Sequence, residues 1–395
     1  MNIKLICGYP FPIGLSATNR IISYCKGLVE NNNQVEIVII NPTENKNNII
    51  NKSVSGTYSG IEFHYSWINI IWPANYIMKI ILFALSFSRS LIYCYKKNRD
   101  NKIDVIISSY DSLIVNLIYF ILSKTIKCKY IYIVDEYPYP LRYGKAPSLF
   151  RRISIKSMCR LFDGIVVMTD ALKEYFSDKI KKDAKLLVMP MTVETERFLN
   201  NNEPSPVEGK YIAYIGELSG NKDGVKDLIE AFRIISGEFP ELKLYIIGKS
   251  KTKIEYNEFE EVISKYDLKE RIILTGRMHR DLVPSYLNHA AMLVLARPNT
   301  IRSQGGFPTK LGEYLAAGRP VVCTAVGEIP NYLTDGINAF LVEPGSNDKF
   351  AGKLKFVLEN PEAAEKVGKE GQKVAINVFN YKMQSARMSG FLKEL

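Results

Sequence analysis

The sequence predicts an α/β chain of two Rossmann-like domains that face each other across a cleft. Its 395 residues exceed what one hydrophobic core holds comfortably. Short β-branched apolar runs alternate with helix-period stretches along the whole chain, as in parallel sheets covered by helices. A polar stretch with two prolines, 200–207, interrupts this alternation and is expected to be a linker. We therefore expect one domain over 1–199, a second over 208–378, and a C-terminal helix, 379–395, that crosses back to the first.

Ten apolar runs are expected to be buried strands, five in each half. Those of the first half are Ile3–Cys7, Val35–Ile40, Val105–Ser109, Tyr130–Val134 and Ile165–Met168. Those of the second half are Tyr211–Ile215, Leu244–Ile247, Ile272–Leu274, Met292–Leu295 and Val321–Cys323. Parallel strands of this kind place ligand sites at their carboxyl ends.

The apolar run at the N-terminus is too short for a signal-peptide core and is expected to be the first strand. The six cysteines are scattered, without a Cys-x-x-Cys pair, and are expected to be reduced core thiols of a cytoplasmic protein. No two of the three histidines have metal-ligand spacing, and no Asp-x-Asp occurs. We therefore expect no metal site.

Positive charge is concentrated in the first half. Residues 1–200 carry 26 Lys and Arg against 16 Asp and Glu, whereas residues 201–395 carry 26 against 25. The stretch 137–162 contains six basic residues and no acidic one. This surplus near aromatic residues favours an anionic membrane surface. Nucleic acid is the other polyanion to consider, but no nucleic-acid-binding motif is present.

The most hydrophobic segment, 68–95, also favours a membrane surface. Pro73 and Asn75 interrupt its uncharged run, so it is expected not to span a bilayer. A helix over 76–97 places its basic residues on one arc: Lys79, Arg89, Lys96 and Lys97. Such a helix suits a membrane interface. An amphipathic helix packed on the sheet, with a solvated basic edge, is the alternative.

The segment 292–322 combines a strand, a glycine-bearing loop and a helix. Pro308 suits the first helical position. Lys310 lies in the first turn, where free amides and the helix dipole attract a diphosphate. Glu313 shares its face and has oxygens that can accept two hydroxyl hydrogen bonds, as from a ribose. These residues form a candidate nucleotide site; a plain surface Lys–Glu pair is the alternative.

Within this segment, the stretch Phe307–Val322 resembles the donor-binding signature of family-4 retaining glycosyltransferases. The stretches 214–232, 274–280, 326–330 and 335–342 are also similar to that family. The resemblance covers 208–375 well and the first half only in outline. It implies the GT-B fold, a nucleotide-sugar donor linked to UDP or GDP, no cofactor, and transfer with retention at the anomeric carbon.

The resemblance also implies roles for single residues. Glu313 would bind the donor ribose, and Lys222 would contact the diphosphate and offset leaving-group charge, joined by Lys310. The family often has arginine where Glu217 stands, so Arg297 or Arg302 is expected to substitute. It often has a glutamate eight residues before the ribose-binding one, where this chain has Gly305. Contacts to the sugar are therefore expected from the Gln304 side chain and from the backbone amides of Gly306 and Phe307.

Two sites in the first half complete the expectations. The loop after the first strand contains Gly14, which in the family borders phosphate and acceptor; a simple strand-to-helix turn is the alternative. Ser16 is expected to cap the next helix. Asp135 and Glu136 follow the strand 130–134, and either is a candidate general base for the acceptor hydroxyl. A structural ion pair with the nearby basic residues is the alternative for both.

These observations predict a metal-independent retaining glycosyltransferase. We expect it at the cytoplasmic face of the cell membrane, as a peripheral protein that extends a lipid-linked or other surface-glycan acceptor. Two alternatives remain open. One is a nucleotide-sugar epimerase on the same fold. The other is an inactive homologue that serves as a membrane-associated partner subunit.

Overall fold

The computed structural model describes residues 1–201, 203–218, 222–250 and 252–395. The chain divides into two compact units, Met1–Thr192 together with Tyr381–Leu395, and Val193–Asn380. Each unit is built on its own sheet, and all strands but one run parallel to their neighbours. The α/β prediction with two parallel sheets is therefore confirmed.

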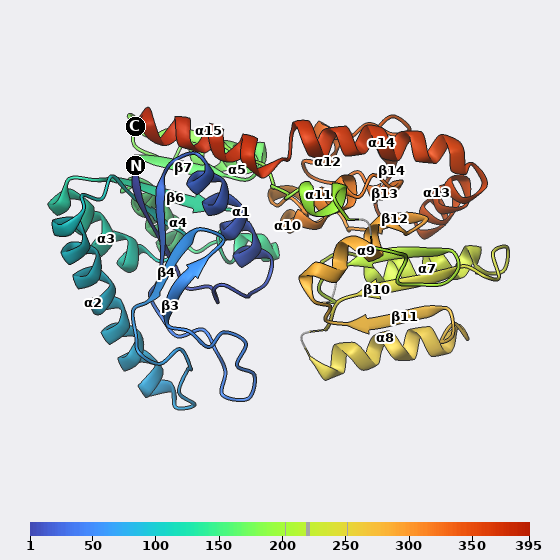
Figure 1. Ribbon diagram of the computed structural model, residues 1–395, viewed down its shortest axis with the longest axis horizontal. Helices are drawn as coiled ribbons and strands as arrows, with labels where there is room; N and C mark the ends of the chain where they lie inside the picture. Colours follow the sequence, from blue (N-terminus) through green and yellow to red (C-terminus); the bar gives the residue numbers. More distant parts are fainter. Residues whose placement is uncertain (202, 219–221, 251) are drawn as a thin grey trace. The chain divides into compact units, whose positions relative to one another are not determined.

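The first unit has an eight-stranded sheet of order β3-β4-β2-β1-β5-β6-β7-β8, in which β3 alone is antiparallel (Figure 1). The strands are β1 (Asn2–Cys7), β2 (Gln34–Ile39), β3 (Ser55–Tyr58), β4 (Ile61–Tyr65), β5 (Val105–Ser108), β6 (Lys129–Val134), β7 (Gly164–Val167) and β8 (Lys185–Val188). The central strand β1 is buried along its whole length, as expected for a parallel strand covered on both faces.

Seven helices belong to this unit: α1 (Ser16–Glu30), α2 (Tyr76–Asp100), α3 (Leu113–Ile126), the 3₁₀ helix η1 (Leu141–Tyr143), α4 (Leu149–Cys159), α5 (Asp170–Ser177) and α15 (Tyr381–Lys393). The C-terminal helix α15 packs along α1 (Figure 1). The close contact depends on Gly27, because a Cβ there would lie 2.3 Å from Ser385 Oγ. Tyr381 donates a hydrogen bond of 2.8 Å to Glu30, which fixes the register of the pair.

The second unit has a six-stranded parallel sheet of order β11-β10-β9-β12-β13-β14. Its strands are β9 (Tyr211–Ile215), β10 (Lys243–Ile247), β11 (Ile272–Gly276), β12 (Met292–Leu295), β13 (Val321–Thr324) and β14 (Phe340–Val342). Its helices are α6 (Glu196–Leu199), α7 (Val225–Ser236), α8 (Lys253–Lys265), η2 (Arg280–Leu282), α9 (Val283–Asn288), α10 (Ile301–Gly305), α11 (Thr309–Ala316), α12 (Ile329–Tyr332), α13 (Asn347–Glu359) and α14 (Pro361–Asn377).

The boundary between the units lies at 192/193, not at the predicted linker 200–207. Backbone pairing explains the difference. Val193 donates to the carbonyl of Phe379 at 2.8 Å, and Asn380 donates to Thr195 at 3.0 Å. The helix α6 then packs against α9 and α11 of the second unit. The polar, proline-containing stretch 200–207, of which residue 202 lies outside the described residues, thus falls within the second unit.

The predicted helix over 76–97 is α2, which runs on to Asp100. Pro73 and Asn75 precede this helix, so the prediction that they interrupt it is wrong. Asn75 is its N-cap, and its side chain accepts from the amides of Ile77 and Met78. By length and composition alone, this is a helix that can cross a membrane. Its C-terminal half is nevertheless packed on the unit, where Ser90 bonds to Tyr119 of α3 at 2.6 Å.

All six cysteines are buried free thiols, in agreement with the expectation of reduced core residues. Burial raises the pKa of the Cys7 thiol to about 12. A thiol this far from ionisation is a poor nucleophile. The cysteines therefore serve packing.

Candidate functional site

The candidate nucleotide site lies where β12 leads through α10 into α11. The short helix α10 was not predicted, although Thr300 followed three residues later by Ser303 is its capping signal: the two side chains bond reciprocally to each other's backbone amides. Pro308 is the N-cap of α11 and not, as was predicted, its first helical residue, because its ψ of 106° is extended. The first turn of α11 therefore holds Thr309 and Lys310.

Lys310 is held in a buried polar cluster after β9. Its ammonium lies 2.7 Å from Asp223 Oδ2 and 2.9 Å from the hydroxyl of Tyr214, and it also stacks on the Tyr214 ring. Burial lowers the pKa of Lys310, and attraction from Asp223 opposes that shift. Burial would raise the pKa of Asp223, but the charge and hydrogen bond of Lys310 outweigh burial and hold that pKa at about 2. The aspartate is therefore ionised at neutral pH, and its charge favours the protonated form of the lysine.

Two further cations act on the same cluster. The charges of Lys222, in the β9–α7 loop, and of Arg297, after β12, also lower the pKa of Asp223. The guanidinium of Arg297 is buried and lies 3.4 Å from the carbonyl of Gly306. The positive charges of Lys222, Arg297 and Lys310 gathered here suit a diphosphate. Arg302, the other predicted substitute, lies half-buried in α10.

Glu313 lies one turn after Lys310 and has different partners. Its Oε1 is 3.4 Å from Arg197 of α6, and Arg197 also donates to the carbonyl of Arg280 at 2.5 Å. Burial raises the pKa of Glu313, while the charges of Arg197 and Arg280 act to lower it. The carboxylate keeps 28% of its side-chain surface exposed, so a ligand hydroxyl can reach it.

The residues expected to contact a donor sugar lie just before α11. Gln304 is exposed and donates to Asn299 at 3.1 Å, whereas Gly305 and Gly306 are buried. The Phe307 ring packs against Tyr332 and Phe379, with ring centroids 5.5 and 5.6 Å away. Phe307 can therefore offer only backbone groups to a ligand, which is the contact proposed for it from the sequence.

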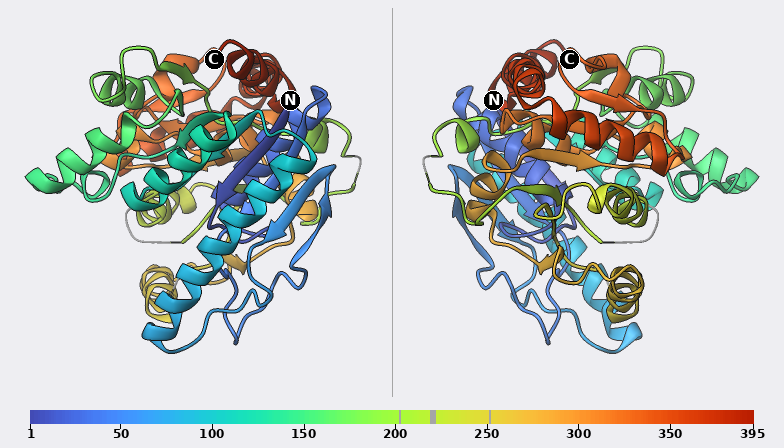
Figure 2. Two further views of the ribbon diagram at one scale, coloured as in Figure 1. Left: turned by 90° about the vertical axis from the view of Figure 1, so that its left-hand side faces the viewer. Right: turned by 90° about the vertical axis from the view of Figure 1, so that its right-hand side faces the viewer.

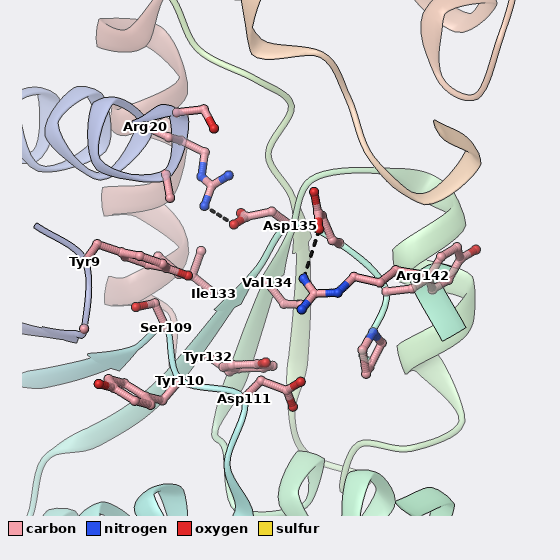
Figure 3. Close-up of a pocket in the computed structure, with 16 residues that line it drawn as sticks. Tyr9, Arg20, Ser109, Tyr110, Asp111, Tyr132, Ile133, Val134, Asp135 and Arg142 are labelled. Carbon is pink, nitrogen blue, oxygen red and sulfur yellow. Dashed lines mark hydrogen bonds and ion pairs between the residues drawn. The ribbon is translucent and has the colours of Figure 1, made fainter. Parts of the chain in front are cut away.

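The first unit has a pocket of about 440 Å³ at the carboxyl ends of β1, β5 and β6 (Figure 3). Asp135 and Glu136 both line it. Asp135 accepts from Arg20 of α1, and Glu136 lies 3.0 Å from Arg142 of η1. The rings of Tyr9, Tyr110 and Tyr132 also face the pocket.

The charges of this pocket are balanced. Arg20 and Arg142 pair with Asp135 and Glu136, and the remaining lining carboxylate, Asp111, lies 2.8 Å from Arg151. The Nε–H groups of Arg20 and Arg142 are buried without a hydrogen-bond partner in the described part of the chain. The pocket therefore offers ligand donors, acceptors and aromatic faces without net charge.

The loop after β1 differs from expectation at Ser16. Gly8 of this loop lines the pocket, and Gly14 does not. A Cβ at Gly14 would lie 2.0 Å from Thr18 Oγ1, so packing of the loop on α1 already requires glycine there. Ser16 is the first residue of α1, not its cap, and the N-cap Leu15 makes no side-chain bond.

Asp223, Arg197 and Arg20 are site residues that the sequence reasoning missed. Asp223 carried a signal, because it is an acidic residue that directly follows Lys222 in the stretch between a predicted strand and the next helix. Arg20 carried a weaker signal: it precedes two isoleucines in a helix with few other charges, a setting that indicates a buried arginine. In the described residues no group of three or more His, Cys, Asp or Glu side chains is placed to hold a metal ion.

Comparison with known proteins identifies a family that matches the second unit. The model of the family described as glycosyl transferases group 1 matches residues 195–374. A kanosaminyltransferase of Streptomyces kanamyceticus is 21% identical over 184 residues, which are 47% of this chain and 45% of that protein. The capsular polysaccharide biosynthesis glycosyltransferase CapM of Staphylococcus aureus is 25% identical over 249 residues, or 58% of this chain and 62% of CapM. The chain thus spans about half the length of the curated relatives it matches.

Solved structures match along the whole chain. Sucrose-phosphate synthase from Thermosynechococcus elongatus has a TM-score of 0.76 at 15% identity, over 100% of this chain and 98% of that one. The Anabaena protein HepE in complex with UDP has a TM-score of 0.72 at 14% identity, over 100% of both chains. Residues 195–374 thus match the glycosyl transferases group 1 family, and the two units have the GT-B fold of these solved structures.

Proposed function

We propose that the protein is a retaining glycosyltransferase that moves a sugar from a nucleotide-sugar donor to a surface-glycan acceptor. The observation that carries this proposal is the cation cluster of Lys222, Arg297 and Lys310, one helical turn from the accessible carboxylate of Glu313. A diphosphate and a ribose are joined covalently at about this spacing in a nucleotide. The family match over the same residues supports the assignment.

In the proposed reaction the bond from the anomeric carbon to the diphosphate oxygen breaks, and a bond to the acceptor hydroxyl oxygen forms. The nucleoside diphosphate leaves with the electron pair, and the hydroxyl proton passes to a base. Lys222 and Lys310 would stabilise the negative charge that develops on the leaving group. Because these side chains supply positive charge, the proposed mechanism needs no metal ion.

The donor would be bound entirely by the second unit. Glu313 would accept hydrogen bonds from the ribose hydroxyls, and the exposed Gln304 would contact the sugar together with the Gly306 and Phe307 amides. The HepE structure with UDP and glucose supports a UDP-linked donor for this fold. GDP remains the alternative nucleotide.

We propose that the pocket of the first unit binds the acceptor, with Asp135 or Glu136 as the proton acceptor. Its balanced charge favours an uncharged sugar over a phosphate. Tyrosine rings stack on sugar faces, and paired carboxylates and guanidiniums bind hydroxyls. A lipid phosphate attached to that sugar would then lie outside the pocket. The role of CapM in capsular polysaccharide biosynthesis supports a surface glycan, and we place the protein at the cytoplasmic face of the cell membrane.

A panel of UDP-, GDP- and dTDP-sugars, each incubated with and without a membrane extract, tests this function. We expect one donor to release its nucleoside diphosphate only when the extract is present, with the anomeric configuration of the donor kept in the product. Conversion of the sugar without any acceptor would identify an epimerase instead. Failure of the folded protein to bind every donor would identify an inactive partner subunit.

Replacing Arg142 with alanine is expected to raise the KM for the acceptor severalfold and leave the donor KM unchanged. The pair with Glu136 is about a third exposed, so its loss should cost less than about 1 kcal/mol of stability. Kinetics with both substrates varied check this, and Lys179→Ala is the control, since Lys179 pairs with Asp178 of the same unit but does not line the pocket. An unchanged acceptor KM would remove the pocket from the proposal.

A further inference from the structure

The outward side of α3 is unusual for a helix in water. Its exposed residues at helical spacing are Ile114, Leu117 and Ile121, and Ile114 keeps 71% of its surface exposed. The opposite side packs inward through Val115, Tyr119 and Ile126, together with Asn116 and Ser123. An apolar stripe on the outward side of a helix that already packs inward is normally covered by protein or lipid. Among the described residues of the first unit, none covers this outer side.

The neighbouring helices extend this surface on both sides. In Figure 2, left, α2, α3 and α4 lie side by side in front of the sheet, in agreement with the contacts of α3 to both neighbours. The first turn of α4 exposes Leu149 by 73% and Phe150 by 81%. The first half of α2 exposes Tyr76, Ile77 and Ile80 by more than half. We call the outer side of these three helices the three-helix face.

The three-helix face is strongly basic as well as apolar. The helices α2, α3 and α4 contain nine Lys and Arg residues, of which Lys124 and Arg151 pair with Asp163 and Asp111, and one acidic residue, Asp100 at the end of α2. Lys79, Arg152 and Lys156 are exposed and form no ion pair within the described residues. The face therefore combines the two features that attract a protein to anionic lipid.

Both tryptophans of the chain lie at one end of this face. Trp67 and Trp72 line a cavity of about 760 Å³ together with Met78, Leu82 and Leu85 of α2. The guanidinium of Arg89 stacks on the Trp67 ring at 4.3 Å. Indole rings favour the boundary between lipid and water, and a cavity beside them can take part of an acyl chain.

We infer that the three-helix face docks on an anionic lipid bilayer, with α3 and the first turns of α2 and α4 inserted among the head groups. Charge complementarity favours lipid over a second copy of this chain, because two such basic faces would repel each other. Packing excludes a span by α2 alone, because Ser86, Ser90 and Cys94 are buried against the unit. This inference rests on the proposed attachment to a membrane. Vesicle binding needs neither donor nor acceptor, so the docking inference and the proposed transferase activity can fail separately.

Flotation of the full chain with vesicles tests this inference. We expect binding to vesicles of phosphatidylcholine mixed with phosphatidylglycerol, and much weaker binding to phosphatidylcholine alone. Salt should weaken the binding without abolishing it, since apolar insertion is not screened. Brominated lipids should quench the tryptophan fluorescence, which reports Trp67 and Trp72 alone.

Leu149→Glu and Ile114→Glu should each lower the partition coefficient by about tenfold or more, because each removes an apolar contact and adds a negative charge. Ile254→Glu is the matched control: Ile254 lies in the first turn of α8 and is 73% exposed, as Leu149 is. Nucleotide binding by all three variants should equal that of the wild type, which shows that they are folded.

Two results would overturn the inference. One is the absence of binding to anionic vesicles at low salt by a chain that still binds nucleotide. The other is equal vesicle binding by the two face variants and the Ile254 control. If the protein sediments as a dimer without lipid, and Leu149→Glu dissociates that dimer, the face binds a second copy of the chain instead.

Discussion

Replacing Asp223 with alanine is expected to lower the free energy of unfolding of the second unit by about 3–5 kcal/mol. The variant leaves the ammonium of Lys310 buried without its carboxylate, and a buried charge that loses its partner is strongly destabilising. Only 5% of the Asp223 side chain and 13% of the Lys310 side chain are exposed. Denaturant unfolding followed by a probe of the second unit measures the loss.

Glu258→Ala is the matched control for this prediction. Glu258 pairs with Lys226 at the same 2.7 Å, but both side chains are nearly half exposed. Removing this partner should cost less than about 1 kcal/mol. The double variant Asp223→Asn/Lys310→Met should be more stable than Asp223→Ala, since it removes both charges. Equal losses for Asp223→Ala and Glu258→Ala would show that burial does not govern the Lys310 pair.

The same pair predicts a dependence of stability on pH. The pKa of Asp223 is held at about 2, below its ordinary 3.8. The unfolded chain therefore binds a proton more readily, and the stabilisation by Asp223 is complete above the unfolded pKa. It is lost as the pH falls through the folded pKa. The stability difference between wild type and Asp223→Ala should accordingly shrink below pH 3.8.

Glu313→Gln is expected to weaken donor binding by about 10- to 100-fold, since hydrogen bonds to a charged group contribute about 1.5–3 kcal/mol. The glutamine keeps the shape but accepts through one oxygen only. Calorimetric titration with the nucleoside diphosphate of the preferred donor measures the change. The 2′-deoxy analogue provides the control: the wild type should bind it more weakly, and the variant should lose little further affinity.

The pH dependence of binding gives an independent check on Glu313. Burial raises the pKa of its carboxyl, so the proton returns at a higher pH than in the unfolded chain. Affinity for the nucleotide should fall as the pH is lowered through this raised pKa. The Gln variant should lack that fall. If the affinity of the wild type depends on pH in the same way as that of the variant, Glu313 does not bind the ribose.

Much of the architecture was predictable because its signals are local. The buried parallel strands are apolar runs, and each of the ten predicted strands is found within two residues of its expected ends. The strands β3, β4, β8 and β14 were missed, although β4 with five residues is as long as the predicted β9. The strand–loop–helix order around Lys310 and Glu313 was likewise predicted from adjacent residues. The short helix α10 was missed although its capping pair was visible.

The partners of the site residues were not predictable from the sequence. The paired residues are far apart in the sequence: Lys310 and Asp223 by 87 positions, Glu313 and Arg197 by 116, and Asp135 and Arg20 by 115. The sequence suggested that the basic residues of 137–162 act together on an anionic surface. In the structure Arg142 and Arg151 instead pair with carboxylates at the pocket of the first unit.

The sequence by itself determined the class of fold, the family motif and the position of the basic, apolar helices. These depend on periodicity and on neighbouring residues, which the chain order fixes. The tertiary structure alone decided which charges are neutralised and which apolar side chains stay exposed. Burial and ion pairing depend on segments that only folding brings together. For that reason Lys310 is a paired, buried cation, and Ile114, Leu149 and Phe150 remain on an uncovered face.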